Sequence, residues 1–435
     1  MTAGAGGRRR YAVVGLGSRA RMYTSAILGE HRERAELVGF CDTSSVRMAW
    51  HNAQLAERFG AGPVRAYDPG GFEQMLADCG VETVIVTSVD RTHDRYIVAA
   101  TRAGCEVITE KPLTIDASRC QAIVDAVKES GRRVTVAFNY RYAPRNSTVK
   151  RLLAGGAVGQ VLSVHFEWLL DTSHGADYFR RWHRDKDNSG GLMVHKASHH
   201  FDLVNWWLGA RPELVFGLGR LAFYGRENAE SRGAGGLYER AHGSRAAERD
   251  PFALDLASDP TLRGLYLEAE KEDGYLRDRG VFSDGISIED DMAVMVRYST
   301  GSTLTYHLTA YSPWEGYRVA FNGTEGRLEL EVVERSWVDP ADRGLPEAGE
   351  EEVRIRLRPL WREPEEVGVE APGMGGHGGA DGLLLADLFG DSGEVDPLER
   401  ASGHLDGVLA VLPGIGANAS FATGRPVELA SLVHL

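Results

Sequence analysis

The sequence predicts an α/β domain built on a parallel sheet, residues 1–145, followed by an α+β domain, residues 146–435, with an open, mostly antiparallel sheet packed on helices. Three observations support this fold class. Before residue 145, continuous apolar strands alternate with helices, which is typical of a parallel sheet covered on both faces. After about residue 150, apolar and polar residues alternate, as in a sheet with one packed face. With 435 residues, 43% of them hydrophobic, the chain is long enough for two domains.

The first domain is predicted as a series of strand and helix units. A short strand at 11–14 meets the glycine turn GLGSRA, and a helix follows over 21–28. A second strand, AELVGFCD, ends at Asp42. The next segments alternate between strand and helix: VETVIVTS, DRYIVAATRAG, EVITEKP, SRCQAIVDAVKESG and RVTVAFNYR. Their order indicates parallel strands joined by crossover helices.

The second domain begins with VLSVHFEWLL, in which every second residue is apolar, from Leu162 to Leu170. STLTYHLTAY, YRVAFNG and RLELEVV repeat this pattern. We expect residues 225–285 to form a long insertion, partly helical and without evident chemistry. Residues 338–380 contain five prolines and are predicted to loop over the surface. Two last helices, DGLLLADLF and HLDGVLAVLPGIGANASFATG, are expected to close the domain.

The composition narrows the possible partners. A formal net charge of −13 argues against nucleic acid and anionic membranes, because both attract basic surfaces. No apolar run approaches the roughly 20 residues of a membrane helix. The four cysteines lie in the first 120 residues without a C-x-x-C pair, so we expect buried thiols in a reducing cytoplasm. A small-molecule partner fits these features best.

The motif GLGSRA has the form of a phosphate-binding glycine turn. Gly15 permits the tight turn, Gly17 allows a pyrophosphate to approach the backbone, and Ala20 replaces a frequent third glycine. The helix that follows offers free N–H groups to phosphates. The alternative is a glycine turn in an unrelated α/β protein. The predicted cofactor-binding residues of this turn are Gly15, Gly17, Ser18, Arg19 and Ala20.

Asp42, at the end of the second strand, lies where an acidic residue accepts hydrogen bonds from an adenosine ribose. A carboxylate there also repels a 2′-phosphate, so the sequence favours NAD over NADP. Arg47 is close enough in the sequence to keep NADP as the less favoured cofactor. Together these motifs predict a Rossmann dinucleotide-binding domain.

The motif TEKPL at the end of a late strand, together with GGLMVHKASHHFD in the second domain, resembles the glucose-fructose oxidoreductase/inositol dehydrogenase (Gfo/Idh/MocA) family. The resemblance covers nearly the whole chain. It implies an NAD(P)-dependent enzyme acting on sugars or cyclitols, with Lys111 as the catalytic lysine and His199 as the catalytic histidine. It also implies a homodimer or homotetramer, since the open sheet face commonly pairs with another subunit.

The same resemblance assigns further residues to the cofactor and the cleft. It implies that the bond between Lys111 and Pro112 is cis, which turns the lysine side chain into the cleft. Glu110 matches a residue that helps to hold the cofactor. Asn139 and Arg141 fall where the family lines the nicotinamide and substrate cleft. Three residues of VTSVDRTHD match the loop against the cofactor: Thr87, Ser88 and His93.

The stretch VHKASHHFD departs from the family, because His195 stands where many members have an aspartate. On one helix His195, His199 and Asp202 would share a face, which permits a metal site, a set of interface histidines or an acid/base cluster. Lys196 disfavours a metal, because an ammonium opposes a dication, and we predict none. The sequence favours catalysis for His199, with His195 as a second acid/base, and a structural bond for His200.

Oxidation of a secondary alcohol needs an acceptor for the hydroxyl proton while hydride leaves the same carbon. His199 suits this task, with Lys111 stabilising the developing charge or relaying the proton. The predicted substrate-binding residues are Arg141, Tyr178, Trp182, Arg184 and Lys196, with aromatic faces for a sugar ring and charges for its hydroxyls.

The first hypothesis is thus an NAD-dependent dehydrogenase or ketoreductase for a sugar, glycoside or inositol. The second hypothesis is a redox-neutral glycosidase or lyase, in which transient ring oxidation acidifies the adjacent C–H and permits elimination. A second base at His195 keeps it open. A third is a catalytically silent NAD-binding sensor.

Overall fold

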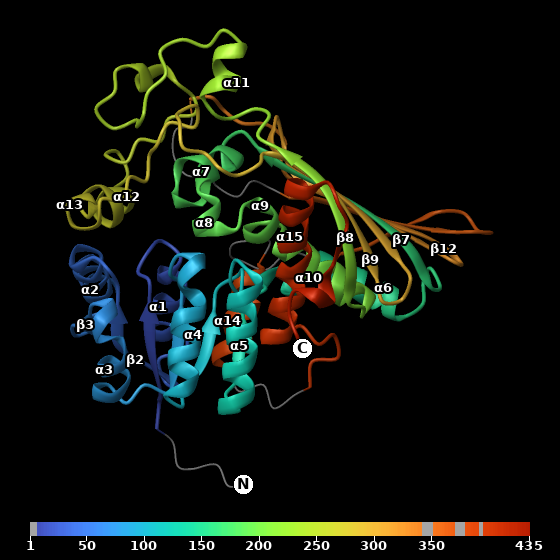
Figure 1. Ribbon diagram of the computed structural model, residues 1–435. Coiled ribbons are helices and arrows are strands. Elements are labelled where there is room, and N and C mark those ends of the chain that lie inside the picture. The colour runs from blue at the N-terminus through green and yellow to red at the C-terminus, as the bar shows by residue number, and fades with distance from the viewer. Residues whose placement is uncertain (1–6, 342–350, 370–378, 391–394) are drawn as a thin grey trace.

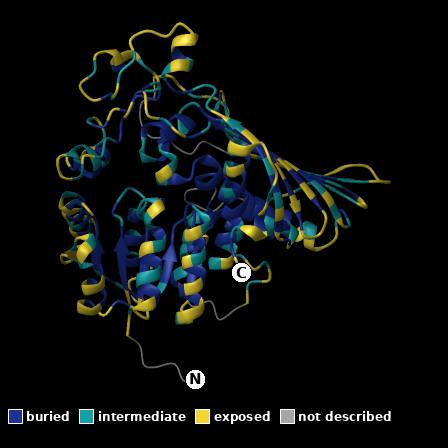
Figure 2. Cartoon of the chain, viewed as in Figure 1, coloured by how far each residue is buried: buried dark blue, intermediate teal, exposed yellow. Residues whose placement is uncertain are grey.

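The computed structural model describes residues 7–341, 351–369, 379–390 and 395–435. A parallel six-stranded sheet carries helices on both faces, and a nine-stranded, mostly antiparallel sheet extends away from it with helices on one face (Figure 1). The predicted fold class is confirmed. Buried residues gather in the six-stranded sheet and where the helices pack on the larger sheet, whose strands alternate between buried and exposed positions (Figure 2).

The first sheet has strand order β3-β2-β1-β4-β5-β6. All strands are parallel, but the chain adds β2 and β3 on one side of β1 and β4 to β6 on the other, so the order of the strands reverses between β1 and β4. In such a sheet ligands bind at the carboxyl ends of the strands beside this reversal. The strands are β1 (Arg9–Val14), β2 (Ala35–Cys41), β3 (Arg65–Tyr67), β4 (Thr83–Val86), β5 (Glu106–Thr109) and β6 (Val134–Val136). The helices are α1 (Ala20–Leu28), α2 (Ser45–Phe59), α3 (Phe72–Asp78), α4 (His93–Arg102) and α5 (Ala117–Ser130).

The last predicted strand of this sheet is shorter than expected. RVTVAFNYR pairs with its neighbour only over β6, and the chain then turns through a 3-10 helix at Asn139–Tyr142. Pro144 follows and begins α6 (Pro144–Ala154), where its fixed φ suits the first helical turn. The turn places Asn139 and Tyr140 beyond the carboxyl end of β6, at the edge where ligands bind in sheets of this kind.

The second sheet has strand order β14-β13-β12-β11-β7-β10-β9-β8-β15, and only the pair of β7 and β10 is parallel. Along β7, Val164, Phe166 and Trp168 are buried and the residues between them face outward. Leu162, expected to be buried, is 53% exposed at the start of β7. The strands are β7 (Val161–Asp171), β8 (Pro212–Arg220), β9 (Asp291–Tyr298), β10 (Thr303–Ser312), β11 (Glu315–Gly323), β12 (Gly326–Arg335), β13 (Glu352–Pro359), β14 (Glu365–Val367) and β15 (Val427–Glu428).

The helices of this part converge on the inner face of the large sheet. Helix α15 packs closely on α9, since a side chain at Gly414 would meet the carbonyl oxygen of Met193 at 2.2 Å. Helix α15 is also long and apolar enough to cross a membrane, and 56% of its most apolar window is buried inside the protein. The helices are α7 (His174–Arg180), α8 (Lys186–Ser189), α9 (Leu192–His195), α10 (Ala197–Leu208), α14 (Ala380–Phe389) and α15 (His404–Thr423).

Two expectations about local structure are wrong. The VHKASHHFD stretch is not one helix, because α9 ends at His195 and α10 begins at Ala197. Part of 338–380 is not a surface loop, since β13 and β14 form a hairpin that extends the sheet. The apolar residues Val353, Ile355 and Leu357 alternate along β13, a period that the prolines around it obscured.

The insertion is partly helical, as expected, and its helices are short pieces. It rises above the first sheet and returns beside α2, where α13 lies (Figure 1). Its pieces are α11 (Arg226–Ser231), a 3-10 helix at Ala246–Arg249, α12 (Pro260–Leu262), a π-helix at Arg263–Leu267 and α13 (Glu270–Asp273).

Candidate active site

The glycine turn after β1 is packed against the loop after β4. Gly15 has φ +83°, and a side chain there would meet the Cα of Ser88 at 2.4 Å. The hydroxyl of Thr87 donates to the carbonyl oxygen of Gly15 at 2.5 Å and fixes the turn. Helix α1 then begins at Ala20 with neither a capping side chain nor an acidic residue in its first turn. Its N–H groups therefore suit phosphates, and the turn fits a dinucleotide.

Asp42 ties the end of β2 to the glycine turn. One carboxylate oxygen accepts the N–H of Leu16 at 2.5 Å. The other accepts the N–H of Ser44 at 2.8 Å and the Nε of Arg47 at 2.9 Å. Asp42 therefore lies beside the glycine turn, as expected. It is paired with Arg47, the residue that had left NADP as the less favoured cofactor.

Lys111 lies at the carboxyl end of β5, and its bond to Pro112 is cis. Its Nζ donates to the carbonyl oxygen of His195 at 3.3 Å, which joins the two halves of the chain at one point. Burial and, after it, the nearby ammonium of Lys196 lower the pKa of Lys111 to about 7. His93 lies behind this bend, between the carbonyl oxygens of Pro112 and Ser88 at 2.9 and 3.1 Å. The contact of His93 with the carbonyl oxygen of Pro112 therefore fixes the backbone next to Lys111.

A cluster of polar and aromatic side chains surrounds His195. Its Nδ1 is 2.6 Å from a carboxylate oxygen of Asp90, and both side chains are buried. The rings of His183 and Tyr178 meet the His195 ring edge to face, with centroids 4.1 and 5.5 Å away. Trp182 stacks on His183 at 3.5 Å. Two predicted substrate residues, Tyr178 and Trp182, thus lie beside the predicted acid/base.

Burial sets the protonation of this cluster. It lowers the pKa of His195 well below its ordinary value, and the cation of Lys111 lowers it further. Burial also raises the pKa of Asp90. Both shifts favour the uncharged forms, a neutral imidazole and a carboxylic acid, which remain joined by the hydrogen bond.

The ligand atoms of Asp90, His183 and His195 lie within 4.8 Å of one another, which raises the question of a metal. Two imidazoles on one tetrahedral Zn²⁺ have ring centroids about 5 Å apart, from Zn–N bonds near ~2.0 Å. These two rings are only 4.1 Å apart, and the cations of Lys111 and Arg181 act on Asp90. Geometry and charge therefore favour proton transfer over metal binding.

His199 and Lys196 line an aromatic wall next to this cluster. The ring of His199 stacks on Tyr140 at 4.4 Å. The ammonium of Lys196 lies 4.6 Å above the face of Trp168, where the ring attracts a cation. His200 stacks on the same Trp168 indole at 4.0 Å, and its Nδ1 is 2.6 Å from the hydroxyl of Tyr306. It is buried, as expected of a structural histidine.

The remaining cofactor-side residues form one polar network. Glu110 accepts the Nε of Arg19 at 2.5 Å and the hydroxyl of Tyr23 at 2.8 Å. Asn139 donates to Asp381 at 2.7 Å, and the guanidinium of Arg19 lies 3.5 Å from the same carboxylate. These contacts link the first turn of α1 to β5 and to α14.

The structure does not bring two of the predicted substrate residues to this cluster. Arg141 is 3% exposed and forms a paired contact with Asp202, at 2.5 and 2.8 Å. That pair also removes Asp202 from the face it was expected to share with the histidines. Arg184 donates to the carbonyl oxygens of Gly280 and Asp284, at 3.3 and 2.6 Å, and so holds the end of the insertion.

Comparisons with known proteins agree with this architecture. Residues 9–138 match the model of the oxidoreductase family's NAD-binding Rossmann fold, and residues 150–353 match the model of its C-terminal alpha/beta domain. YteT of Bacillus subtilis (strain 168), whose name assigns it to the oxidoreductases, is 34% identical over 97% of this chain and 98% of its own length. The chain belongs to the Gfo/Idh/MocA oxidoreductase family.

Other members of the Gfo/Idh/MocA family are similar over smaller parts or at lower identity. The scyllo-inositol 2-dehydrogenase (NAD(+)) of Bacillus subtilis (strain 168) is 28% identical over 34% of this chain and 41% of its own length. The structure of the aldose-aldose oxidoreductase of Caulobacter crescentus, complexed with glycerol, has a TM-score of 0.62 at 17% identity, covering 97% of this chain and all of its own. The last likeness shows the fold alone.

The sequence did not single out two groups of residues in this Gfo/Idh/MocA site. Asp90 lies in the loop VTSVDRTHD, directly after β4. Polar residues at the carboxyl ends of parallel strands lie near the ligand, so this position could have marked Asp90 as a site residue. His183 lies in the stretch DYFRRWHRDKDNSGG, which also holds the predicted substrate residues Tyr178 and Trp182. The second group belongs to the insertion, and no sequence signal marks it. Tyr266 contacts Ser18 of the glycine turn, and Glu272 and Asp273 contact Ser44 and Arg47 around the start of α2.

Proposed function

We propose that this NAD-binding oxidoreductase transfers hydride between the nicotinamide and a secondary alcohol or ketone of a sugar, glycoside or inositol, with Lys111 and His199 as its acid/base pair. The observation that carries the proposal is the contact of the Lys111 ammonium with the backbone of His195, at 3.3 Å. It brings the predicted lysine to the histidine segment at the carboxyl edge of the parallel sheet. The name of the related scyllo-inositol 2-dehydrogenase supports the substrate class.

Lys111 suits both directions of the reaction. With a pKa of about 7, it is partly ammonium and partly neutral amine near neutral pH. The neutral amine accepts the hydroxyl proton as an alcohol is oxidised, and the ammonium returns it to a ketone oxygen. When bound, the nicotinamide supplies the acceptor or donor of hydride. Gly15, Gly17, Ser18 and Asp42 would hold the dinucleotide.

The histidines complete the acid/base set. His199, stacked on Tyr140, presents an imidazole of fixed orientation from α10. His195 carries a second proton through its bond with Asp90. Tyr178 and Trp182 offer ring faces beside it for the C–H groups of a sugar.

The preference for NAD and a cytoplasmic location are part of the same proposal. NAD is favoured because Asp42 stands beside the glycine turn and pairs with Arg47. A cytoplasmic site of action is supported by the four cysteines, which are all free and buried.

A second candidate function is a redox-neutral glycosidase or lyase. The observation that favours it is the buried pair of His195 and Asp90, a second acid/base beside Lys111. After transient oxidation of a ring hydroxyl, this pair could take the acidified C–H proton, and the substituent on the next carbon would leave with the electron pair. Return of hydride would then restore the hydroxyl.

Absorbance at 340 nm during turnover with a panel of inositols, aldoses and glycosides tests both candidates. Net formation of NADH supports the dehydrogenase, and cleavage of a glycoside without NADH accumulation supports the redox-neutral cycle. Lys111→Met should lower kcat by about 10²- to 10⁴-fold in either case, the range for loss of a general acid/base. Full activity of Lys111→Met across the panel would contradict the proposal.

A further inference from the structure

We propose that residues 263–273 of the insertion form a strap that closes over the adenosine half of the dinucleotide site and selects NAD over NADP through Asp273. This inference rests on the proposed function, which supplies the dinucleotide. The strap is the π-helix at Arg263–Leu267 together with α13 and the residues that join them. It lies more than 200 residues from the glycine turn in the sequence, and the fold brings the two together.

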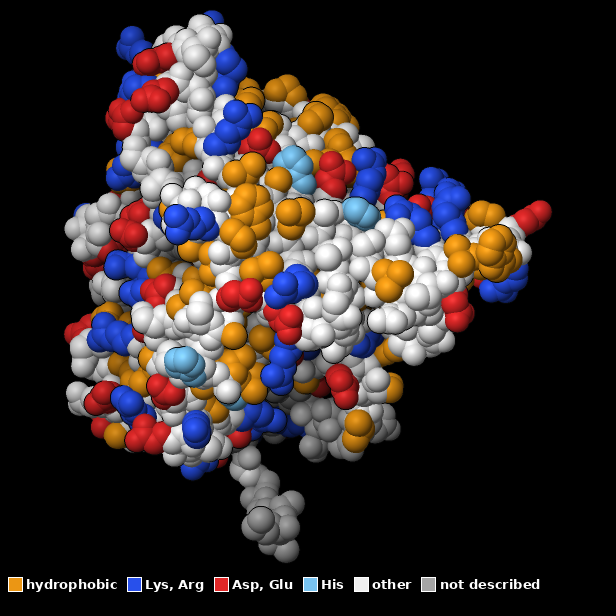
Figure 3. Space-filling view, turned by 45° about the vertical axis from the view of Figure 1, so that its right-hand side comes forward, with side chains coloured by type: hydrophobic (Ala, Val, Ile, Leu, Met, Phe, Trp, Pro, Cys, Tyr) orange, Lys and Arg blue, Asp and Glu red, His pale blue; other side chains and the backbone are white. Residues whose placement is uncertain are grey.

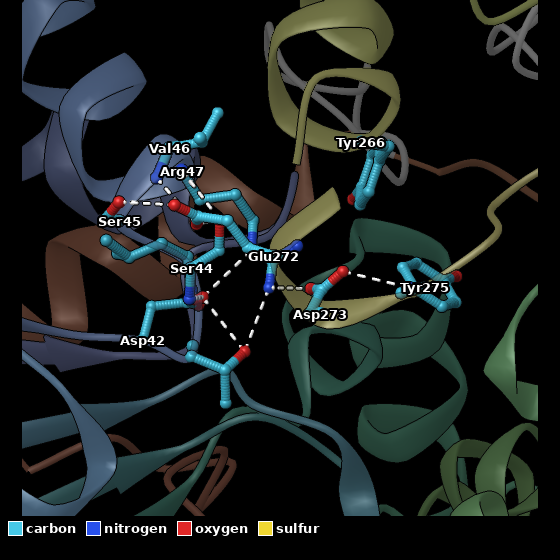
Figure 4. A network of polar contacts seen from close by, with 12 residues as sticks. Asp42, Ser44, Ser45, Val46, Arg47, Tyr266, Glu272, Asp273 and Tyr275 are labelled. Atoms are coloured by element: carbon cyan, nitrogen blue, oxygen red, sulfur yellow. Dashed lines mark hydrogen bonds and ion pairs between the residues drawn. The ribbon is translucent and has the colours of Figure 1, made fainter. Parts of the chain in front are cut away.

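The acidic tip of the strap is bound to the start of α2. One oxygen of Glu272 accepts the hydroxyl of Ser44 at 2.7 Å and the N–H of Val46 at 3.2 Å, and the other accepts the hydroxyl of Ser45 at 2.6 Å (Figure 4). These hydrogen bonds, with that of Ser45 the largest, lower the pKa of Glu272 to about 2. The carboxylate therefore stays anionic at neutral pH and caps the N-terminal turn of α2 in trans.

The neighbouring carboxylate, Asp273, accepts the Nη2 of Arg47 at 2.5 Å (Figure 4). The Nε of the same guanidinium donates to Asp42 at 2.9 Å, so Arg47 lies between two carboxylates and is only 7% exposed. Selection of a 2′-phosphate at this point of a Rossmann domain needs a cation free to bind it. Two negative charges around one buried positive charge leave a site that repels a phosphate and accepts ribose hydroxyls.

Tyr266 extends the strap to the pyrophosphate turn. Its hydroxyl accepts the N–H of Ser18 at 3.1 Å and lies 2.9 Å from the hydroxyl of Ser18. The N–H of Ser18 is among the groups that the turn offers to a phosphate. Because a phenol both accepts and donates, Tyr266 can accept from Ser18 here and donate to a phosphate oxygen when the dinucleotide is bound.

The strap is firmly held at both sides but only partly packed against the first sheet. Its Gly264 lies against α2, since a side chain there would meet the Trp50 ring at 2.3 Å. A cavity of about 650 Å³ separates part of the strap from the start of α2. Half of its lining is charged, and the lining residues are Val46, Leu267, Glu268, Glu270, Lys271 and Leu276. Polar groups thus make most of the closing contact, and such a contact can open and re-form without exposing a large apolar surface.

Beyond the strap, the insertion is anchored next to the substrate residues. Arg277 donates to Asp177 at 2.9 Å, and its guanidinium lies 5.7 Å above the ring of Tyr266. Asp177 belongs to α7, which also carries Tyr178 beside His195. Contacts through Arg277 and α7 therefore connect the strap with the predicted substrate residue Tyr178.

Binding of NAD⁺ and NADP⁺ to the full-length protein, measured by isothermal titration calorimetry, tests the selection. We expect wild type to prefer NAD⁺ and Asp273→Asn to bind NADP⁺ about tenfold more tightly, with less than about a threefold change for NAD⁺. Glu268→Gln is the matched control, because it removes the same charge from an exposed residue of the strap that contacts neither Ser44 nor Arg47. An Asp273→Asn variant with the wild-type ratio of affinities would overturn the strap's role in selection.

The closing of the strap is tested on the wild-type protein by hydrogen exchange, so the result does not depend on the folding of a variant. NAD⁺ should slow amide exchange in residues 263–273 and at the start of α2, and Glu272→Gln should release NADH about fivefold faster in stopped-flow fluorescence. Unchanged exchange in a protein that binds NAD⁺ would overturn the strap alone. A wild-type protein that binds neither dinucleotide would overturn the proposed function, and the strap with it.

Discussion

Lys111 shows how one buried residue can be prepared for proton transfer by its surroundings. Burial disfavours its ammonium form, and the positive charge of Lys196 adds to this, so the pKa falls from 10.5 to about 7. Lys196 in turn is held over the face of Trp168 rather than in a direct ion pair with the substrate cluster. The lysine that follows His195 in the sequence is therefore expected to tune Lys111 as much as to bind substrate.

The pH dependence of alcohol oxidation should report this tuning. The acceptor must be unprotonated, so kcat/KM for oxidation should rise as the pH passes through about 7, and the rate of ketone reduction should fall. Lys196→Met removes a like charge and should move the oxidation limb upward by about 0.5–1 pH unit, while Lys196→Arg should leave it in place. A limb that does not move in Lys196→Met would assign the titration to another group.

At the scale of elements, the glycine turn and the loops after β4 and β5 act as one unit. Thr87 holds Gly15, and His93 lies between the backbone of Ser88 and the cis bond after Lys111. The sequence predicted the strands that precede these three loops, because buried strands and glycine turns are local patterns. It could not predict the contacts between loops, which depend on the register of neighbouring parallel strands.

Two glycines of the turn should respond differently to alanine. Gly15→Ala places a side chain 2.4 Å from the Cα of Ser88 at a positive φ, so it should lower the melting temperature by at least about 3 °C and abolish NAD binding. Gly17→Ala meets only the hydroxyl of Tyr266, at 3.5 Å, and should keep the melting temperature within about 2 °C while weakening NAD binding. Differential scanning fluorimetry and calorimetric titration measure the two effects. Equal melting temperatures for both variants would refute the close packing of this turn.

At the scale of the whole molecule, the large sheet presents an outer face without covering helices (Figure 1). A shallow cavity of about 700 Å³ on this face includes Phe216, Leu218, Ala293 and Met295. The space-filling view shows charged side chains of both signs over the molecule, with hydrophobic ones among them (Figure 3). A domain boundary near residue 145 stays a prediction, supported by the separation of β1–β6 and β7–β15 into two sheets.

The outer face should form the subunit contact of a homodimer or homotetramer, because Leu218 and Met295 are 65% and 55% exposed on it. Light scattering coupled to size exclusion should show an oligomer for the wild type and a monomer when both residues are changed to glutamate. Val395→Glu, at a position that is 92% exposed elsewhere, is the control and should stay oligomeric. A wild-type monomer, or a double variant of unchanged mass, would contradict this assignment.

The sequence by itself determined the fold class, the glycine turn, the acidic residue after β2 and the lysine after β5. Strand and helix periods, turns and strand ends are set by residues close to one another in the chain, so they can be predicted without coordinates. The tertiary structure decided which groups meet. His195 is hydrogen-bonded to Asp90, 105 residues away, and Asp202 is paired with Arg141. Tyr266 of the insertion contacts Ser18 of the glycine turn. Such pairings depend on how separate elements dock, and hydrophobic periodicity does not encode which side chain faces which across that contact.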